Sequence, residues 1–248
     1  KIDRLNYPMT TLNKQSFEWA LYIDIEGFSA KFEQGAKDSF IKLTNDLFTI
    51  GSHFYDYLSI EQFGGDGFLL KQVSICSPNF EKPIELATLL LKLILLRGGI
   101  GRVQISHGYM ADTKGLYSDE IQNSIRMNGS DNLLNGKRNI MGIKPLIGTS
   151  IINAHKLKGP SGPLLLVDVE LESNLIESRI PFTKLNFHNQ NVLSVNWVKF
   201  DTERIQEIVD FIGLNSSIDY TQLVKNYIQN NSLTNEWIQG AVTLIQNN

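Results

Sequence analysis

Apolar residues recur at helical spacing over residues 27–54 and again over residues 83–96, so the sequence predicts a helix in each range. Short runs rich in apolar and β-branched residues predict strands over 17–25, 57–63, 67–74 and 101–108. Residues 64–66 separate the second strand from the third. Their two glycines predict a hairpin, because glycine adopts the positive φ angles of a tight turn at no steric cost. This order of elements is typical of a ferredoxin-like βαββαβ palm, a fold of the α+β class.

The next part of the chain is expected to complete this palm. Residues 110–145 are rich in asparagine, glycine, serine and aspartate, which predicts a long loop or flap with little regular structure. The pattern then predicts a helix over residues 146–157 and an edge strand over residues 164–169. We therefore assign residues 1–169 to the palm domain.

Residues 170–248 are predicted to form a C-terminal extension. Its pattern indicates a strand followed by helices, over 192–200, 201–212 and 217–246. The last helix is expected to break near Asn230. These additions are expected to cover the palm or a partner subunit.

Composition narrows the classes of partner. The chain has 248 residues with a hydrophobic fraction of 42%, enough for one sizeable core, and a net charge of -3 with a pI near 5.8. No block of basic residues offers a surface for nucleic acid or an anionic membrane, so neither partner is expected. The longest apolar run, residues 84–96, is shorter than the roughly 20 residues that cross a bilayer. The single cysteine, Cys76, and the lack of an apolar signal segment at the start predict a cytoplasmic protein.

Two aspartates are the strongest candidates for chemistry. Asp24 lies at the end of the first predicted strand, and Asp66 lies in the glycine turn of the hairpin. Taken alone, an aspartate at a strand end is more often a turn residue than a ligand. The palm topology, however, makes the first strand a neighbour of the hairpin, so both carboxylates are expected at one edge of the sheet. One or two carboxylates with substrate phosphates are the usual ligands of magnesium, which predicts phosphoryl chemistry on a nucleotide.

Five stretches, in the same order along the chain, resemble the class III nucleotidyl cyclases. Residues 22–29 resemble the first metal motif of this family, and residues 63–66 resemble the second. Further similarities in the expected order cover residues 102–108, 148–157 and 159–168. The resemblance implies that Asp24 and Asp66 bind two Mn²⁺ or Mg²⁺ ions, with the backbone carbonyl of Ile25 completing the metal shell. It also implies a homodimer whose active site lies between the subunits.

Other residues are candidates for binding the nucleotide. Gly27, Gly64 and Gly65 are expected to let backbone amides approach phosphate oxygens, because they carry no side chain that would obstruct them. Phe28 is a candidate for stacking on the base, although aromatic residues at such spacing are usually part of a core. Gln62 is a candidate for reading a base edge through its amide, although it is as readily a polar residue on a sheet face.

A cation is needed opposite the negative charge that develops on the leaving pyrophosphate. Lys156 is the first candidate for this catalytic role, and Arg102, Lys137 and Arg138 are alternatives. Arg102 is also a candidate for binding the nucleotide directly. The alternative, non-catalytic interpretation of Lys156 is a solvated lysine on a helix surface.

Departures from the family pattern point to a particular branch. Gln62 stands where adenylate cyclases commonly carry a base-reading lysine, and Ile152 and Lys156 stand in place of the usual asparagine and arginine. Residues 148–157, the Asn196–Trp197 pair and the C-terminal helices look more like the pyrimidine cyclases of the bacterial Pycsar anti-phage system. That similarity implies a synthase that makes cyclic UMP or cyclic CMP from UTP or CTP, which then activates a separate effector.

Two other functions remain open from the sequence. The string around Asp66 is also similar to the signature of diguanylate cyclases, but Gly67 stands where those enzymes keep a glutamate. A catalytically silent module that binds nucleotide is favoured by the missing asparagine and arginine and disfavoured by the presence of both Asp24 and Asp66.

Overall fold

The computed structural model describes residues 16–26, 37–53, 58–63, 67–72, 80–112, 118–128, 132–135, 138–142, 146–215 and 217–246. The first part of this chain forms strands and helices in the predicted order. They are β1 (Ser16–Ile25), α2 (Lys37–His53), β2 (Leu58–Phe63), β3 (Gly67–Gln72), α3 (Glu81–Leu96) and β4 (Gly101–Asp112).

The pairing of these four strands defines the palm. β1 pairs antiparallel with β3 on one side and with β4 on the other, and β3 pairs antiparallel with β2. The order β2–β3–β1–β4 is that of a ferredoxin-like βαββαβ sheet, so the predicted α+β fold class is confirmed.

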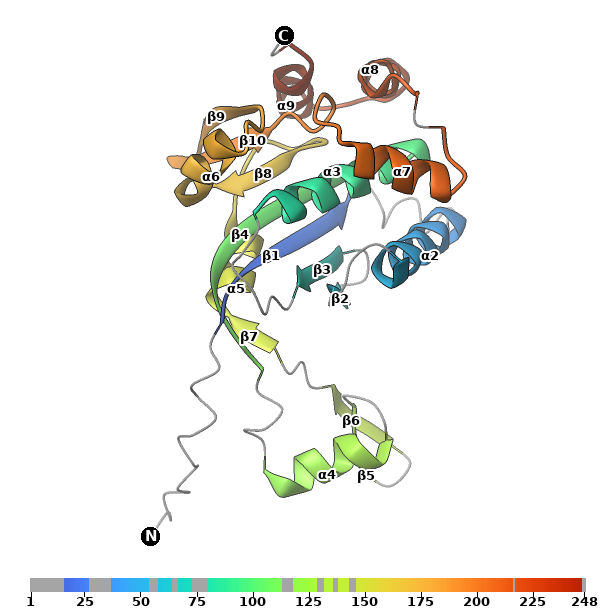
Figure 1. The fold of residues 1–248 in the computed structure, drawn as a ribbon, viewed down its shortest axis with the longest axis vertical. Coiled ribbons are helices and arrows are strands. Elements are labelled where there is room, and N and C mark those ends of the chain that lie inside the picture. Colours follow the sequence, from blue (N-terminus) through green and yellow to red (C-terminus); the bar gives the residue numbers. More distant parts are fainter. Residues whose placement is uncertain are drawn as a thin grey trace.

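Helices α2 and α3 cover one face of this sheet. Successive side chains of a strand point to opposite faces, and Leu21 and Ile23 of β1 are buried in the same core cluster as residues of both helices. Helix α3 is apolar on nearly all sides, and it is buried along its length, as the run of residues 84–96 predicts. Figure 1 shows α3 running alongside β1. In the part of the chain that the structure describes, no helix is long and apolar enough to span a membrane.

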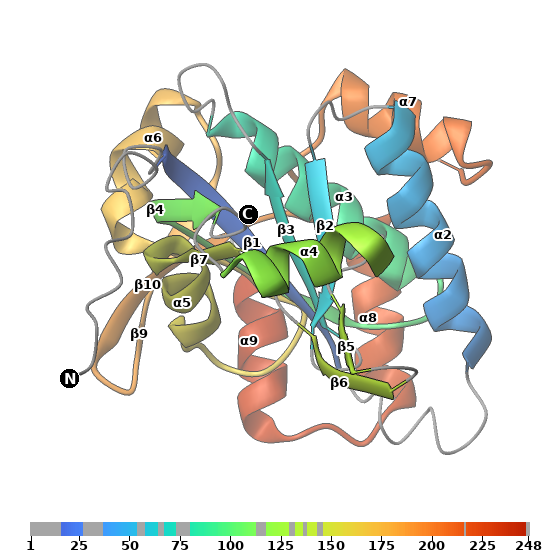
Figure 2. The same cartoon turned by 90° about the horizontal axis from the view of Figure 1, so that it is seen from below.

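Residues 110–145 contain regular structure, so the predicted loop is wrong for the part described. β4 continues to Asp112, and the segment then forms α4 (Asp119–Asn128), β5 (Asn132–Asn135) and β6 (Arg138–Gly142). The polar residues that suggested a loop instead belong to these elements: α4 begins with Asp119 and Glu120, which favour a helix N-terminus. Figure 1 shows these elements apart from the main sheet, and in Figure 2, seen from below, they lie in front of it.

The helix predicted over 146–157 divides into two elements. β7 (Leu146–Gly148) pairs antiparallel with the end of β4, and α5 (Thr149–Lys156) follows it. The early start predicted for the helix is wrong because β4 extends far enough to pair with residues 146–148. The backbones of β7 and β4 approach closely here: a Cβ at Gly148 would lie 2.2 Å from the carbonyl oxygen of Tyr109.

The prediction of an edge strand at residues 164–169 is also wrong. β8 (Leu165–Asp168) lies inside the sheet, parallel to β4 and antiparallel to β10 (Gln190–Val195). Leu164, Leu165, Leu166 and Val167 are all buried, and strands buried on both faces read as continuous apolar runs.

The C-terminal extension continues both the sheet and the core. Besides β10 it contains η3 (Val169–Leu171), α6 (Glu172–Glu177), β9 (Phe182–Phe187), α7 (Glu203–Phe211), α8 (Tyr220–Asn230) and α9 (Asn235–Gln246). The predicted strand over 192–200 ends at Val195, and the break near Asn230 separates α8 from α9. Buried side chains of α7, α8 and α9 belong to the same core cluster as β1 and α3. The domain boundary at residue 169 stays a prediction.

Candidate active site

Asp24 lies next to the last residue of β1, on the sheet face opposite to α3. Its neighbour across the antiparallel pair is Arg102 of β4, and residues directly opposite each other project from the same face. Ala20 and Tyr22 precede Asp24 on this face, where α5 covers part of the strand. Asp24 itself is half-buried, at the rim of the covered area.

The hairpin begins its return strand beside Asp24. β1 and β3 pair as far as Ile23 and Phe68, and one further step of the same register would place Asp24 opposite Gly67. The sequence neighbour of Gly67 is Asp66. Asp66, the residue expected to bind metal ions together with Asp24, therefore directly precedes the strand that pairs with β1.

Several predicted site residues lie outside the described part of the chain. They are Gly27, Phe28, Gly64, Gly65, Asp66 and Lys137. Gln62 pairs with Phe68 in the β2–β3 hairpin, but its side chain is not described, and the same holds for the side chain of Arg138 in β6. Their roles, like the separation of the two carboxylates, stay predictions.

Arg102 brings a cation to the end of β1. It is half-buried, and burial lowers the pKa of its guanidinium, while the negative charges of Asp24, Glu26 and Glu236 act in the opposite direction. Within the described residues, its Nε atom is buried without a hydrogen-bond partner. The desolvated guanidinium thus lies in the field of three carboxylates, one of which is the predicted metal ligand.

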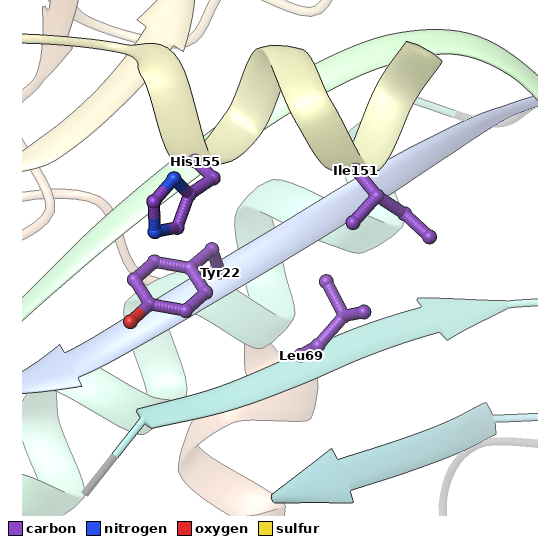
Figure 3. Close-up of a pocket in the computed structure, with 4 residues that line it drawn as sticks. All are labelled: Tyr22, Leu69, Ile151 and His155. Carbon is purple, nitrogen blue, oxygen red and sulfur yellow. The ribbon is translucent and has the colours of Figure 1, made fainter. Parts of the chain in front are cut away.

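A small hollow lies on the same sheet face beneath α5. Tyr22, Leu69, Ile151 and His155 line it, and Figure 3 shows the rings of Tyr22 and His155 next to each other. The two ring centroids are 5.3 Å apart, and the ring planes meet at 72°, an edge-to-face contact. The side chain of His155 therefore packs on β1 two residues before Asp24.

Lys156 and Ile152 are on the outside of the same helix. Lys156 is the last residue of α5 and is exposed, and Ile152 is 49% exposed. The structure thus brings the predicted catalytic lysine to the end of a helix that covers the site face, with its side chain toward solvent. Its catalytic role stays a prediction.

Two residues of α9 belong to this site and were not predicted from the sequence. The indole Nε1 of Trp237 donates a 2.7 Å hydrogen bond to Oε2 of Glu26, and Glu236 acts on the charge of Arg102. Glu26 stands two residues after Asp24, directly beyond the end of β1, so its place beside the first metal motif is the local signal that could have indicated it. No local pattern could have indicated Trp237, because 211 residues separate it from Glu26.

The donor set suits a hard divalent cation only in part. Among the described residues, no group of three or more histidine, cysteine, aspartate or glutamate side chains could bind a metal ion. Asp24 and the carbonyl of Ile25 offer oxygen ligands, which is the chemistry that Mg²⁺ and Mn²⁺ prefer. A complete site would need a further carboxylate from outside the described residues, and Asp66 is the residue predicted for it.

No protein-family model matches the sequence, and no curated protein matches it either. Two crystal structures of cyclases are distantly similar in fold. The guanylyl cyclase Cya2 shares 11% identity over 73% of this chain and 92% of its own, with a TM-score of 0.47. An adenylate/guanylate cyclase/hydrolase from Silicibacter pomeroyi shares 13% identity over 73% of this chain and 97% of its own, with a TM-score of 0.41. Because both similarities are distant, the fold assignment rests on the strand order of this chain.

Proposed function

We propose that this protein is a nucleotidyl cyclase that converts UTP or CTP into the 3′,5′-cyclic mononucleotide and pyrophosphate. One observation supports this proposal most directly: β3, which begins directly after Asp66, pairs with β1 at the end that carries Asp24. The strand that follows the second motif is thereby paired with the strand that carries the first. A triphosphate gripped between their carboxylates is the simplest use of this arrangement.

The reaction is an in-line displacement at phosphorus. The ribose 3′ oxygen forms a bond to the α-phosphorus, the 3′ hydroxyl proton leaves to solvent, and the bond between the α-phosphorus and the bridging oxygen of pyrophosphate breaks. Positioning and neutralisation of negative charge supply most of the acceleration in such reactions.

The residues of this chain would divide these tasks. Asp24, the carbonyl of Ile25 and Asp66 would bind two Mn²⁺ or Mg²⁺ ions, which lower the pKa of the attacking hydroxyl and neutralise the triphosphate when bound. Arg102, half-buried beside Asp24, would orient that carboxylate and add positive charge near the phosphates. Lys156, at the exposed end of α5, would meet the charge on the leaving group, as its place in the family motif implies.

The pyrimidine preference rests on residues that differ from purine cyclases. Gln62 replaces the lysine that commonly reads the adenine base, and Ile152 replaces the family asparagine. The similarity to Pycsar cyclases further supports a homodimer that shares its active sites, and a role as signal synthase in anti-phage defence. A separate effector would then respond to the cyclic pyrimidine nucleotide.

The test is incubation of the purified protein with each of the four ribonucleoside triphosphates and Mn²⁺, followed by separation of the products. We expect a cyclic pyrimidine mononucleotide from UTP or CTP, and at least a hundredfold less from Asp24→Asn. Asp210→Asn is the matched control, because this substitution makes the same chemical change at an exposed residue of α7, away from the site.

Other outcomes would point elsewhere. A cyclic dinucleotide from GTP would favour a diguanylate cyclase, and a cyclic purine mononucleotide would overturn the pyrimidine assignment alone. No product in any mixture would indicate a silent nucleotide-binding module. Equal activity of Asp24→Asn and Asp210→Asn would contradict the proposed site.

A further inference from the structure

Helix α9 contacts the end of β1, and we propose that its Trp237 is a positioning residue that fixes the segment carrying Asp24. The meaning of this role for catalysis rests on the proposed cyclase function. The contact itself joins the far end of the C-terminal extension to the first predicted metal motif.

The hydrogen bond at the centre of this contact is short and partly buried. Trp237 is 2% exposed, and its Nε1 lies 2.7 Å from Oε2 of Glu26. The backbone amide of Glu26 donates to the carbonyl of Ile100 at 2.9 Å, just beyond the last pair of β1 with β4. The residue that follows Ile25 is therefore tied to the sheet by its backbone and to α9 by its side chain.

Trp237 is well placed to act as a fixed donor, because the structure around its ring is closely packed. Tyr227 of α8 stacks on the indole with 5.6 Å between centroids and 24° between planes. Figure 2 shows α8 and α9 side by side. A Cβ at Gly162 would lie 3.3 Å from the carbonyl oxygen of Trp237, so the loop before β8 comes close to α9.

The same loop makes two further contacts with α9. A Cβ at Gly240 would lie 2.5 Å from the carbonyl oxygen of Ser161, so the helix approaches this loop through a residue without a side chain. The amide of Ser161 donates to Oε1 of Glu236 at 3.2 Å. These contacts leave little freedom for α9 to shift or for the indole to turn, since close-packed interiors transmit strain.

Charge connects this contact to the predicted metal ligand. The charges of Asp24, Glu26 and Glu236 all raise the pKa of the Arg102 guanidinium, so the three carboxylates lie within electrostatic range of one cation. The indole of Trp237 engages one oxygen of Glu26 and holds that carboxylate in one orientation. Without this donor, Glu26 gains freedom to compete with Asp24 for Arg102, and Asp24 would be less well oriented toward a metal ion.

The variant Trp237→Phe removes the donor and keeps an aromatic ring for the stack on Tyr227. Trp197→Phe is a matched control: Trp197 is 1% exposed, and its Nε1 donates over 2.7 Å to the carbonyl of Pro163 rather than to a carboxylate beside Asp24. Each substitution removes one 2.7 Å hydrogen bond donated by the indole of a buried tryptophan. They differ in what that bond fixes.

Two measurements on the full chain test the proposal. Amide hydrogen exchange at residues 23–26, a readout that needs no activity, is expected to accelerate in Trp237→Phe and not in Trp197→Phe. The Mn²⁺ concentration for half-maximal turnover is expected to rise about tenfold in Trp237→Phe, the usual effect of losing a partner of a metal ligand. The control is expected to keep the wild-type Mn²⁺ dependence.

Glu26→Ala removes the same bond from its other end and serves if Trp237→Phe does not fold. It is expected to reproduce the faster exchange at residues 23–26 but not the change in Mn²⁺ dependence, because no freed carboxylate remains to compete with Asp24 for Arg102. The double variant is expected to exchange no faster than either single variant. Equal behaviour of the Trp237 and Trp197 variants, or additive losses in the double variant, would overturn the positioning role.

The outcome also separates this proposal from the cyclase function. Suppose that exchange at residues 23–26 accelerates in Trp237→Phe alone and that the protein makes no product. This result would support the positioning role and count against the cyclase function. If the wild type is active and the Trp237 and Trp197 variants behave alike, the cyclase function is supported and the positioning role is contradicted.

Discussion

An ion pair between α3 and the segment before α7, in which only the lysine is buried, offers a sharp test of how the extension is attached. Nζ of Lys92 lies 3.0 Å from Oδ1 of Asp201, and the side chain of Lys92 is 1% exposed while that of Asp201 is 34% exposed. The ammonium also lies 4.8 Å from the ring centroid of Tyr220. The perturbation is Asp201→Asn, which keeps the shape and an oxygen acceptor but removes the charge.

The expected loss follows from the geometry of the pair. Two unit charges about 3 Å apart attract with roughly 5 kcal/mol at an effective dielectric constant of about 20. Removing one partner of a fully buried pair typically costs about 3–5 kcal/mol, because the other charge stays behind uncompensated. Asp201 is partly in water, and asparagine still accepts a hydrogen bond. We therefore expect the free energy of unfolding to fall by about 2 kcal/mol at pH 7.

The loss of stability in Asp201→Asn is also expected to depend on pH in a definite direction. Burial lowers the pKa of Lys92 below 10.5, and the hydrogen bond and charge of Asp201 partly restore it. Between the folded pKa and 10.5 the unfolded chain binds more protons than the folded one, so stability rises with pH in that window. Asp201→Asn lowers the folded pKa further and extends the window downward. Its deficit should therefore be largest near neutral pH and shrink as pH rises.

The upper end of the pH series is limited by Tyr220. Burial, followed by the charges of Asp201 and Asp210, raises the pKa of this phenol from 10.0 to about 12. The protonated phenol therefore stabilises the folded state below pH 10, and this contribution is lost as pH rises from 10 toward 12. Measurements kept below pH 10 report on Lys92 without this opposing effect.

The assay is urea unfolding of wild type, Asp201→Asn and a surface control across this pH range. Glu172→Gln is the control, because Glu172 pairs with Lys184 at 2.7 Å where the lysine is 66% exposed. Exposed pairs contribute about 0.2–1 kcal/mol, so this variant should change little. Equal losses in the two variants, or a deficit of Asp201→Asn that does not shrink with pH, would refute the reasoning.

Further predictions concern the site and the strand that leads from it. Asp66→Ala should abolish cyclic nucleotide formation while circular dichroism and the thermal transition stay unchanged; undiminished product would remove it from the site. Arg102→Met should lower turnover about a hundredfold, because Asp24 loses the cation opposite it; steady-state kinetics with UTP or CTP measures this. Gly148→Ala should destabilise the protein by at least about 1–3 kcal/mol, since a Cβ would lie 2.2 Å from the carbonyl oxygen of Tyr109. A melting temperature equal to that of wild type would contradict the last expectation.

The sequence was informative where local pattern and burial agree. The apolar run of residues 84–96 predicts a buried helix, and α3 is one. Residues 164–167 carry a usable signal of their place in the sheet, because a run of four apolar residues is typical of a strand covered on both faces and not of an edge strand. β9 gave a weaker signal, because this edge strand is only partly buried and mixes polar with apolar residues.

The candidate site divides along the same line. Asp24 could be proposed from its place at a strand end, and Arg102 from the motif of the fourth strand. The hydrogen bond between Glu26 and Trp237 could not be proposed from the sequence, because it depends on how α9 packs once the whole extension has folded. Contacts of this range arise from tertiary packing, which periodicity along the chain does not encode.

The outer surface of α3 indicates why the extension and the palm should fold as one body. A helix that is apolar on all sides must be covered on all sides. One side of α3 contacts β1 and β4, and the side away from the sheet contacts α7 and α8, where Lys92 meets Asp201. A chain ending at residue 169 would expose apolar surface of α3 around Lys92, whose ammonium would lose its partner Asp201. We expect that fragment to aggregate or to lack a cooperative thermal transition, and a monomeric fragment with cooperative unfolding would show that the palm carries its own complete core.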